Sequence, residues 1–148
     1  VFDTGEFLKS SVVVAHGLAY VGAESGQIHA IDLKSGKEKW SYKTDMAIEA
    51  PPLVEAGMVF VGSTDGFLYA LEATTGKLLW RYETDGEIMG APNQAIRPQS
   101  KDSVLVVGSY DNFVHCMDLK TGKALWKFET QNYVNGVPTI YEGKYVVF

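Results

Sequence analysis

The sequence has little of several features that would point to a particular chemistry. It contains one cysteine, Cys116, which excludes an intramolecular disulfide and any cysteine-based zinc site. Its 13 Lys and Arg residues are outnumbered by 18 Asp and Glu residues, and the net charge of −5 argues against nucleic-acid binding. No apolar run approaches the roughly 18–20 residues that span a bilayer, so we predict no transmembrane segment in this chain.

The composition that remains is that of a folded domain. The 148 residues are 46% hydrophobic and 21% charged, close to globular averages, and aromatic residues reach 12%. A chain of this length can bury a core without disulfides or metals. We therefore expect a single globular domain and turn to its internal pattern.

One phrase recurs three times and ends each time in tryptophan. The copies read YVGAESGQIHAIDLKSGKEKW, FVGSTDGFLYALEATTGKLLW and VVGSYDNFVHCMDLKTGKALW. The linking text also repeats, as VFDTGEFLKSS, SYKTDMAIEAPP, RYETDGEIMGAP and KFETQNYVNGVP. Such a period is typical of repeat architectures. The residues that keep their register in every copy are Trp40, Trp80 and Trp126, Gly22, Gly62 and Gly108, and Gly36, Gly76 and Gly122.

Each copy has the alternating pattern of strands rather than the period of a helix. In the second copy we predict strands at 52–55, 58–63, 67–72 and 78–84, separated by glycine-containing turns. Both faces of these strands are apolar, which indicates burial on both sides. Four short antiparallel strands in about 40 residues are the signature of a β-propeller blade. The predicted fold is thus all-β, a propeller of four-stranded antiparallel blades.

The repeat also predicts where the blades begin and end. We expect one partial propeller over 1–148 with about four blades: the last strand of a preceding blade at 1–4, blades at 5–44, 45–84 and 85–130, and an incomplete blade at 131–148. The third blade has six extra residues, which we place in a lengthened turn at 93–103. This division suggests part of a longer propeller.

The phrase VGSTDGFLYALEATTGKLLW resembles the repeat of propellers related to pyrroloquinoline-quinone (PQQ) enzymes. In that family each blade ends in an Ala-Leu-Asp-x-x-Thr-Gly-x-x-x-Trp tryptophan-docking motif, and eight blades are common. The family contains quinoprotein dehydrogenases as well as non-catalytic members. The present chain is closest in style to the latter, such as the propeller lipoprotein of the outer-membrane β-barrel assembly machinery. The resemblance implies a periplasmic, cell-surface or secreted location.

Residues that repeat in every copy are interpreted as architecture. The carboxylates Asp32, Glu72 and Asp118 precede the Ser/Thr-Gly turn and can accept hydrogen bonds from its backbone. His29 and His115 occupy the slot of Tyr69, which indicates a structural ring position rather than a metal ligand. Cys116 matches two alanines and is expected to be a buried small side chain. We predict no catalytic, cofactor-binding or metal-binding residue in this chain.

Positions where the aligned copies differ are candidates for function. They lie where the chain enters each innermost strand, on the loop face that commonly binds ligands or partners in propellers. The column just before them is apolar in all four copies and is expected to be core: Leu8, Ile48, Ile88 and Val134. The candidate partner-face residues are Lys9, Glu49, Met89 and Asn135.

Two functional hypotheses follow. The preferred one is a non-catalytic scaffold that binds a protein or peptide. The alternative is a fragment of a PQQ- and calcium-dependent quinoprotein dehydrogenase. Calcium takes six to eight oxygen ligands, which Glu49 and Asn135 alone cannot supply, and the paired cysteines and axial tryptophan of such enzymes are missing. Sensor and carbohydrate-binding roles stay open.

Self-association to complete a ring is a further expectation. The two end faces of a partial propeller carry apolar residues, and such patches favour association. Two chains of about four blades could close one ring, with 1–4 of one chain completing the last blade of the other. Closure within a single chain is the competing possibility. The apolar residues expected on these faces are Val12, Val14, Val146 and Phe148.

Overall fold

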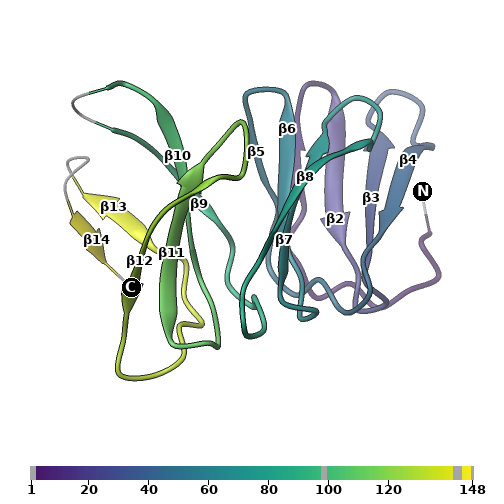
Figure 1. The fold of residues 1–148 in the computed structure, drawn as a ribbon. Helices are drawn as coiled ribbons and strands as arrows, with labels where there is room; N and C mark the ends of the chain where they lie inside the picture. The colour runs from purple at the N-terminus through teal and green to yellow at the C-terminus, as the bar shows by residue number, and fades with distance from the viewer. Residues whose placement is uncertain (1–2, 98–99, 142–144, 148) are drawn as a thin grey trace.

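The computed structural model describes residues 3–97, 100–141 and 145–147. In this part of the chain the secondary structure is entirely β, with three four-stranded antiparallel sheets and one two-stranded sheet (Figure 1). The described residues include no helix with the length and apolar character needed to cross a bilayer. The all-β propeller prediction is confirmed.

Strand order follows chain order in every sheet, so each sheet is a simple meander. The first sheet contains β1 (Val13–Ala15), β2 (Leu18–Gly22), β3 (Gln27–Asp32) and β4 (Glu38–Lys43). The second contains β5 (Leu53–Glu55), β6 (Met58–Gly62), β7 (Phe67–Glu72) and β8 (Leu78–Glu83). The third contains β9 (Asn93–Ile96), β10 (Ser103–Gly108), β11 (Phe113–Asp118) and β12 (Ala124–Glu129). The two-stranded sheet pairs β13 (Thr139–Tyr141) with β14 (Tyr145–Val147).

The hydrophobic core lies between successive sheets rather than within one of them. Residues of the first sheet such as Tyr20 and Ile28 pack with Val61 and Leu71 of the second. The opposite face of the second sheet packs on the third through a separate cluster that includes Phe60. The second sheet is covered on both sides, and its two central strands, β6 and β7, are accordingly apolar on both faces.

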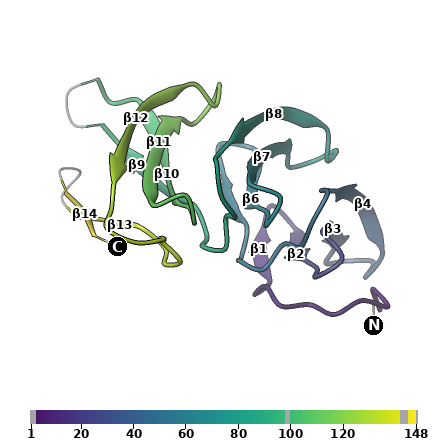
Figure 2. The ribbon, with the colours of Figure 1, turned by 60° about the horizontal axis from the view of Figure 1, so that its bottom comes forward.

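The first strands of neighbouring sheets approach one another. Strand β1 contacts β5, and β9 contacts β13. The fourth strands β4, β8 and β12 lie at the opposite edges of their sheets, and Figure 2 shows the successive sheets arranged side by side along the chain. The first strands are therefore the inner strands of the partial propeller.

The meander places the loops in two groups at opposite ends of the strands (Figure 1). The connector rim comprises the β2–β3, β6–β7 and β10–β11 loops and the segments leading into β1, β5, β9 and β13. The turn rim comprises the β1–β2, β3–β4, β5–β6, β7–β8, β9–β10 and β11–β12 turns. Non-glycine residues adopt the left-handed backbone conformation on both rims, as at Ala56 (φ 50°) and Asn112 (φ 69°).

Three expectations need correction. Residues 93–96 form strand β9, so the lengthened turn is confined to the loop before β10. Of the predicted strand at 1–4, residues 1 and 2 lie outside the described part, and Asp3 and Thr4 are not in a strand; Asp3 Oδ1 accepts a hydrogen bond from Gly5 N at 2.9 Å. Leu8 is 45% exposed and is not part of the core. Its counterpart Ile48 is buried because it packs against Gly22 of the sheet before it, and no described sheet precedes Leu8.

Candidate interaction surface

Backbone hydrogen bonds join the connector rim into one continuous structure. The loop of each sheet donates to the connector before it and accepts from the connector after it. In the first sheet Glu24 N donates to Phe7 O at 2.9 Å, and Ala23 O accepts from Ile48 N at 3.1 Å. The second and third sheets repeat both bonds through Thr64, Ser63, Tyr110 and Ser109. The rim is thus a rigid frame on which side chains are displayed.

Threonines fix each connector to the loop behind it. Thr44 Oγ1 lies 2.8 Å from Gly26 O and 2.7 Å from Met46 O, and Thr84 makes the same pair of contacts. Thr130 repeats the contact to the preceding loop at 2.8 Å. This role of threonine was not predicted, although threonine recurs at positions 4, 44, 84 and 130 in the aligned linking text.

Aspartates close the loops of the second and third sheets. Asp65 Oδ1 accepts a hydrogen bond from Phe67 N at 2.9 Å, while its Oδ2 accepts from Asp45 N at 3.1 Å and from Tyr69 Oη at 2.7 Å. Burial, with this aspartate as a second cause, raises the pKa of Tyr69. Asp111 makes the matching bonds to Phe113 and Asp85. These carboxylates therefore hold the loops and connectors of the rim together.

The histidine slot is buried and hydrogen bonded. His115 Nε2 lies 2.9 Å from Asp111 Oδ2, and its Nδ1 lies 3.0 Å from Tyr82 Oη of the second sheet. Burial lowers the pKa of His115, although Asp111 opposes this shift. In the first sheet Ser25 replaces the aspartate, and a carboxylate from the N-terminal segment takes its place: Glu6 Oε2 accepts from Ser25 Oγ at 2.5 Å and lies 3.7 Å from His29 Nε2.

The repeated glycines lie where side chains of the next repeat come close. A Cβ on Gly22 would lie 2.2 Å from Ile48 Cγ2, and Gly62 and Gly108 stand in the same relation to Ile88 and Val134. Any larger residue at these positions would force the following connector away from the sheet. The glycine column is therefore required by close approach between sheets.

Two of the three repeated tryptophans, Trp40 and Trp80, contact the following sheet. Trp40 Nε1 donates to Ala73 O at 2.9 Å, and a Cβ on Gly76 would lie 2.6 Å from the Trp40 ring. Trp80 lies against Gly122 in the same way, at 2.5 Å. Trp126 is 45% exposed. A backbone hydrogen bond from Ser35 lowers the pKa of the turn carboxylate Asp32. Hydrogen bonds from the Thr121 hydroxyl and backbone lower the pKa of Asp118.

Four side chains on the connector rim have different chemistry in each repeat. Lys9 Nζ lies 3.1 Å from Glu49 Oε1 and 3.1 Å from Glu24 Oε1, and hydrogen bonds to these carboxylates raise the pKa of Lys9. Met89 is half-buried and Asn135 is exposed. Their connectors touch, since a Cβ on Gly90 would lie 2.4 Å from Gly136 O. The structure thus joins Lys9 to Glu49 and places Met89 and Asn135 on adjoining connectors.

Large apolar side chains are exposed on the same rim. Phe7 is 83% exposed and Met46 52%. Tyr133 is exposed and lies against Tyr110 with ring centroids 4.6 Å apart. Exposed aromatic and methionine side chains are enriched at protein interfaces. The rim therefore combines a charged pair, an amide and apolar contact area.

The residues present do not fit PQQ with calcium. Lys9 on the connector rim is already paired with two carboxylates, so it would meet the PQQ carboxylates only by leaving them. Among residues 3–97, 100–141 and 145–147 no group of three or more His, Cys, Asp or Glu side chains could hold a metal ion. Burial raises the pKa of Cys116 to about 11, which disfavours the thiolate that nucleophilic catalysis requires.

Four-stranded sheets that pack face to face, with a tryptophan of one against a glycine of the next, define this chain as a β-propeller repeat protein. It belongs to the family described as outer membrane protein assembly factor BamB, whose model matches residues 3–98 and 89–148. The family resemblance seen in the sequence is thereby confirmed.

Solved structures agree on the fold. BamB from Moraxella catarrhalis superposes with a TM-score of 0.80 at 23% identity, over 95% of this chain and 43% of that chain. The computationally designed Ika4 protein gives 0.76 at 20% identity, over 90% and 80% of the two chains. Quinohemoprotein alcohol dehydrogenase from Comamonas testosteroni gives 0.67 at 27% identity, over 84% and 21%. The chain thus spans less than half the length of that BamB structure. No curated protein matches the sequence significantly.

Proposed function

We propose that this chain is a non-catalytic interaction domain that binds a protein partner through its connector rim and contributes to outer-membrane protein assembly. A periplasmic location is part of the proposal. The family described as outer membrane protein assembly factor BamB supports both statements. Association of two chains into one ring stays a prediction.

The observation that carries this proposal is the contrast between neighbouring positions of one rim. Ile48 and Ile88 are fully buried and fix the connectors, whereas the next residue in each repeat differs in charge and size. These variable positions are Lys9, Glu49, Met89 and Asn135. The backbone of the rim repeats from sheet to sheet, whereas the side chains that it displays differ. A specific protein contact requires such differences, because specificity comes from the particular side chains presented.

The direct test is binding of an unfolded outer-membrane β-barrel polypeptide, measured by fluorescence anisotropy as it is diluted from urea. We expect saturable binding that is weakened at least tenfold in the variant K9A/E49A/M89A/N135A. The matched control K34A/T74A/K120A/K123A changes four turn-rim residues and should bind as the parent does. Equal weakening in both variants, or no binding by the parent, would reject the proposal.

The neighbour from Comamonas testosteroni, at 27% identity, makes a quinoprotein fragment the second candidate. It predicts PQQ binding in the presence of calcium. We expect titration of PQQ with excess calcium to leave the protein fluorescence and the thermal midpoint unchanged, because the ammonium group of Lys9 is already paired with Glu24 and Glu49. Stoichiometric, calcium-dependent binding would favour the enzyme fragment.

A further inference from the structure

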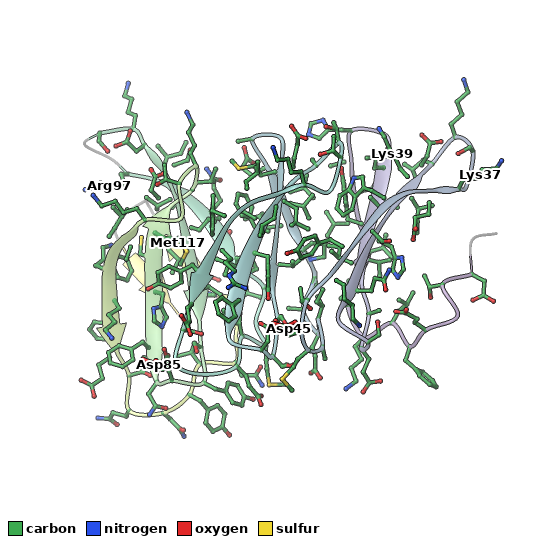
Figure 3. The ribbon with its side chains drawn as sticks, turned by 45° about the vertical axis from the view of Figure 1, so that its right-hand side comes forward. Lys37, Lys39, Asp45, Asp85, Arg97 and Met117 are labelled. Carbon is green, nitrogen blue, oxygen red and sulfur yellow. The ribbon has the colours of Figure 1, made fainter. Side chains whose placement is uncertain are left out.

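The two rims carry opposite charge. Among the described residues, the turn rim holds one carboxylate within its turns, Asp102, and seven exposed cations. In the same part of the chain the loops and connectors of the connector rim hold one cation, Lys9, and Lys43 at the end of β4 donates a hydrogen bond to Ser25 O on this rim. The turn-rim cations are Lys34, Lys37, Lys77, Arg97, Lys101, Lys120 and Lys123. The connector-rim carboxylates are Asp3, Glu6, Glu24, Asp45, Glu49, Asp65, Asp85, Glu87 and Asp111. Figure 3 shows Lys37 and Arg97 at one end of the strands and Asp45 and Asp85 at the other.

The carboxylates at the strand ends beside the turn rim are partly withdrawn from solvent. Asp32, Glu72 and Asp118 are half-buried, and their oxygens accept hydrogen bonds from residues of the following turn. Glu38 and Glu55 are the exposed exceptions, and Glu38 Oε2 lies 2.6 Å from His29 Nδ1. The lysines beyond them are all exposed. A surface that approaches the turn rim therefore meets ammonium groups before it meets carboxylates.

The cations form a row rather than a pocket. Lys37, Lys77 and Lys123 follow the turn glycine in three successive sheets, so the repeat spaces them one sheet apart. The turns that carry them lie along one edge of the molecule (Figure 1). Six of the seven cations are lysines, which act as point charges and lack the bidentate geometry of arginine. Such a row suits a spread, two-dimensional distribution of negative charge.

We propose that the turn rim docks on an anionic lipid surface, with the connector rim facing away from it. Juxtaposed lysines are attracted by phosphate headgroups within about one Debye length. The acidic connector rim is repelled by the same surface, so the separation of charge also fixes the orientation. A membrane-bound molecule would then present Lys9, Glu49, Met89 and Asn135 to a partner.

Nucleic acid is the less suitable polyanion. Single strands are bound through aromatic side chains on which bases stack, and the described turn-rim residues contain no Phe, Tyr or Trp. The net charge of −5 also opposes the approach of a DNA duplex, except where the turn rim faces the duplex.

Co-sedimentation with vesicles tests the proposal. We expect the chain to bind vesicles of equal parts phosphatidylglycerol and phosphatidylcholine, and to stay in solution with phosphatidylcholine alone. Raising the salt from about 0.1 M to about 0.5 M should release it, because screening shortens the reach of each charge. The variant K37E/K77E/K123E should bind at least tenfold more weakly, and K37Q/K77Q/K123Q should lie between it and the parent.

The matched control is K43E/R81E/K127E, which changes the net charge equally but on strands β4, β8 and β12. It should bind far better than the turn-rim reversal. Equal loss in both reversed variants would show that net charge alone decides, and would overturn the oriented surface. Binding to phosphatidylcholine alone, or tighter binding to a DNA duplex or to polyglutamate than to anionic vesicles, would overturn it as well. Partner binding in solution is measured separately, so either proposal can fail without the other.

Discussion

Trp40 and Trp126 are the same residue of the same repeat, yet they have different surroundings. Trp40 is 8% exposed, donates its indole N–H to Ala73 O and lies over Gly76 of the next sheet. Trp126 is 45% exposed on β12, a strand whose six residues are all exposed. The sheet that follows β12 has two described strands, β13 and β14. The strand that carries the tryptophan is alike in both cases, and what differs is the sheet that covers it.

This difference shows that each copy of the repeat supplies only one of the two residues of each tryptophan–glycine contact between sheets. The tryptophan belongs to one copy and its glycine to the next, so neither is stabilised within its own sheet. Gly36 illustrates the other half: nothing lies within 4 Å of where its Cβ would be, whereas the equivalent Gly76 and Gly122 lie under tryptophan rings. Stability in such arrays is the sum of sheet and interface contributions.

The largest expected effect is at the first of these contacts. Trp40→Ala removes a buried ring and its hydrogen bond, and we expect a loss of about 3–5 kcal/mol in the free energy of unfolding. Trp126→Ala should lose less than about 1 kcal/mol, because exposed side chains contribute little. Urea denaturation followed by circular dichroism measures both. Similar losses would mean that Trp126 is covered in solution, as the predicted two-chain ring requires.

The glycine pair sharpens the comparison from the other side. Gly36 (φ 67°) and Gly76 (φ 73°) have the same left-handed backbone, so alanine costs about 1–2 kcal/mol at either. At Gly76 the new Cβ would also lie 2.6 Å from the Trp40 ring, and overpacking adds about 1–3 kcal/mol. Gly76→Ala should therefore destabilise more than Gly36→Ala. Equal losses of stability in thermal unfolding would show that the Trp40 ring does not lie against Gly76.

A smaller effect concerns pH at the second contact between sheets. Burial lowers the pKa of His115, so the unfolded chain binds the proton more readily and stability falls as the pH drops below about 6.5. His115→Tyr installs the residue that the second sheet has at this position, Tyr69. We expect the variant to lose less stability than the parent between about pH 7.5 and pH 5.5. The same loss of stability in both proteins would show that protonation of His115 does not cause the pH dependence.

Much of this architecture could be predicted from the sequence because the repeat aligns it. The strands predicted at 58–63, 67–72 and 78–84 agree with β6, β7 and β8 to within one residue. Asn112 has the positive φ expected of a residue standing in a glycine column. Alternation and turn residues act locally, so one chain contains the information needed to place them.

Contacts between repeats were harder to predict. Glu6 supplies from the N-terminal segment the carboxylate that Asp65 and Asp111 supply from their own loops. The pairing of Lys9 with Glu49 was also unforeseen, since the two were chosen because they differ. Each depends on how far apart two connectors lie, a distance set by the packing of whole sheets. Leu8 was placed in the core because alignment treats every copy as if it had a neighbour.

The central claim is that the following sheet determines how deeply each repeated tryptophan is buried. Acrylamide quenching tests it most directly, in three proteins that each retain one tryptophan and have the other two changed to Phe. The proteins retaining Trp40 or Trp80 should be quenched weakly, and the protein retaining Trp126 several times more strongly, with circular dichroism showing that all three are folded. Strong quenching of Trp40, or a Trp126 as shielded as Trp40 at a concentration where the protein is a monomer, would contradict the account.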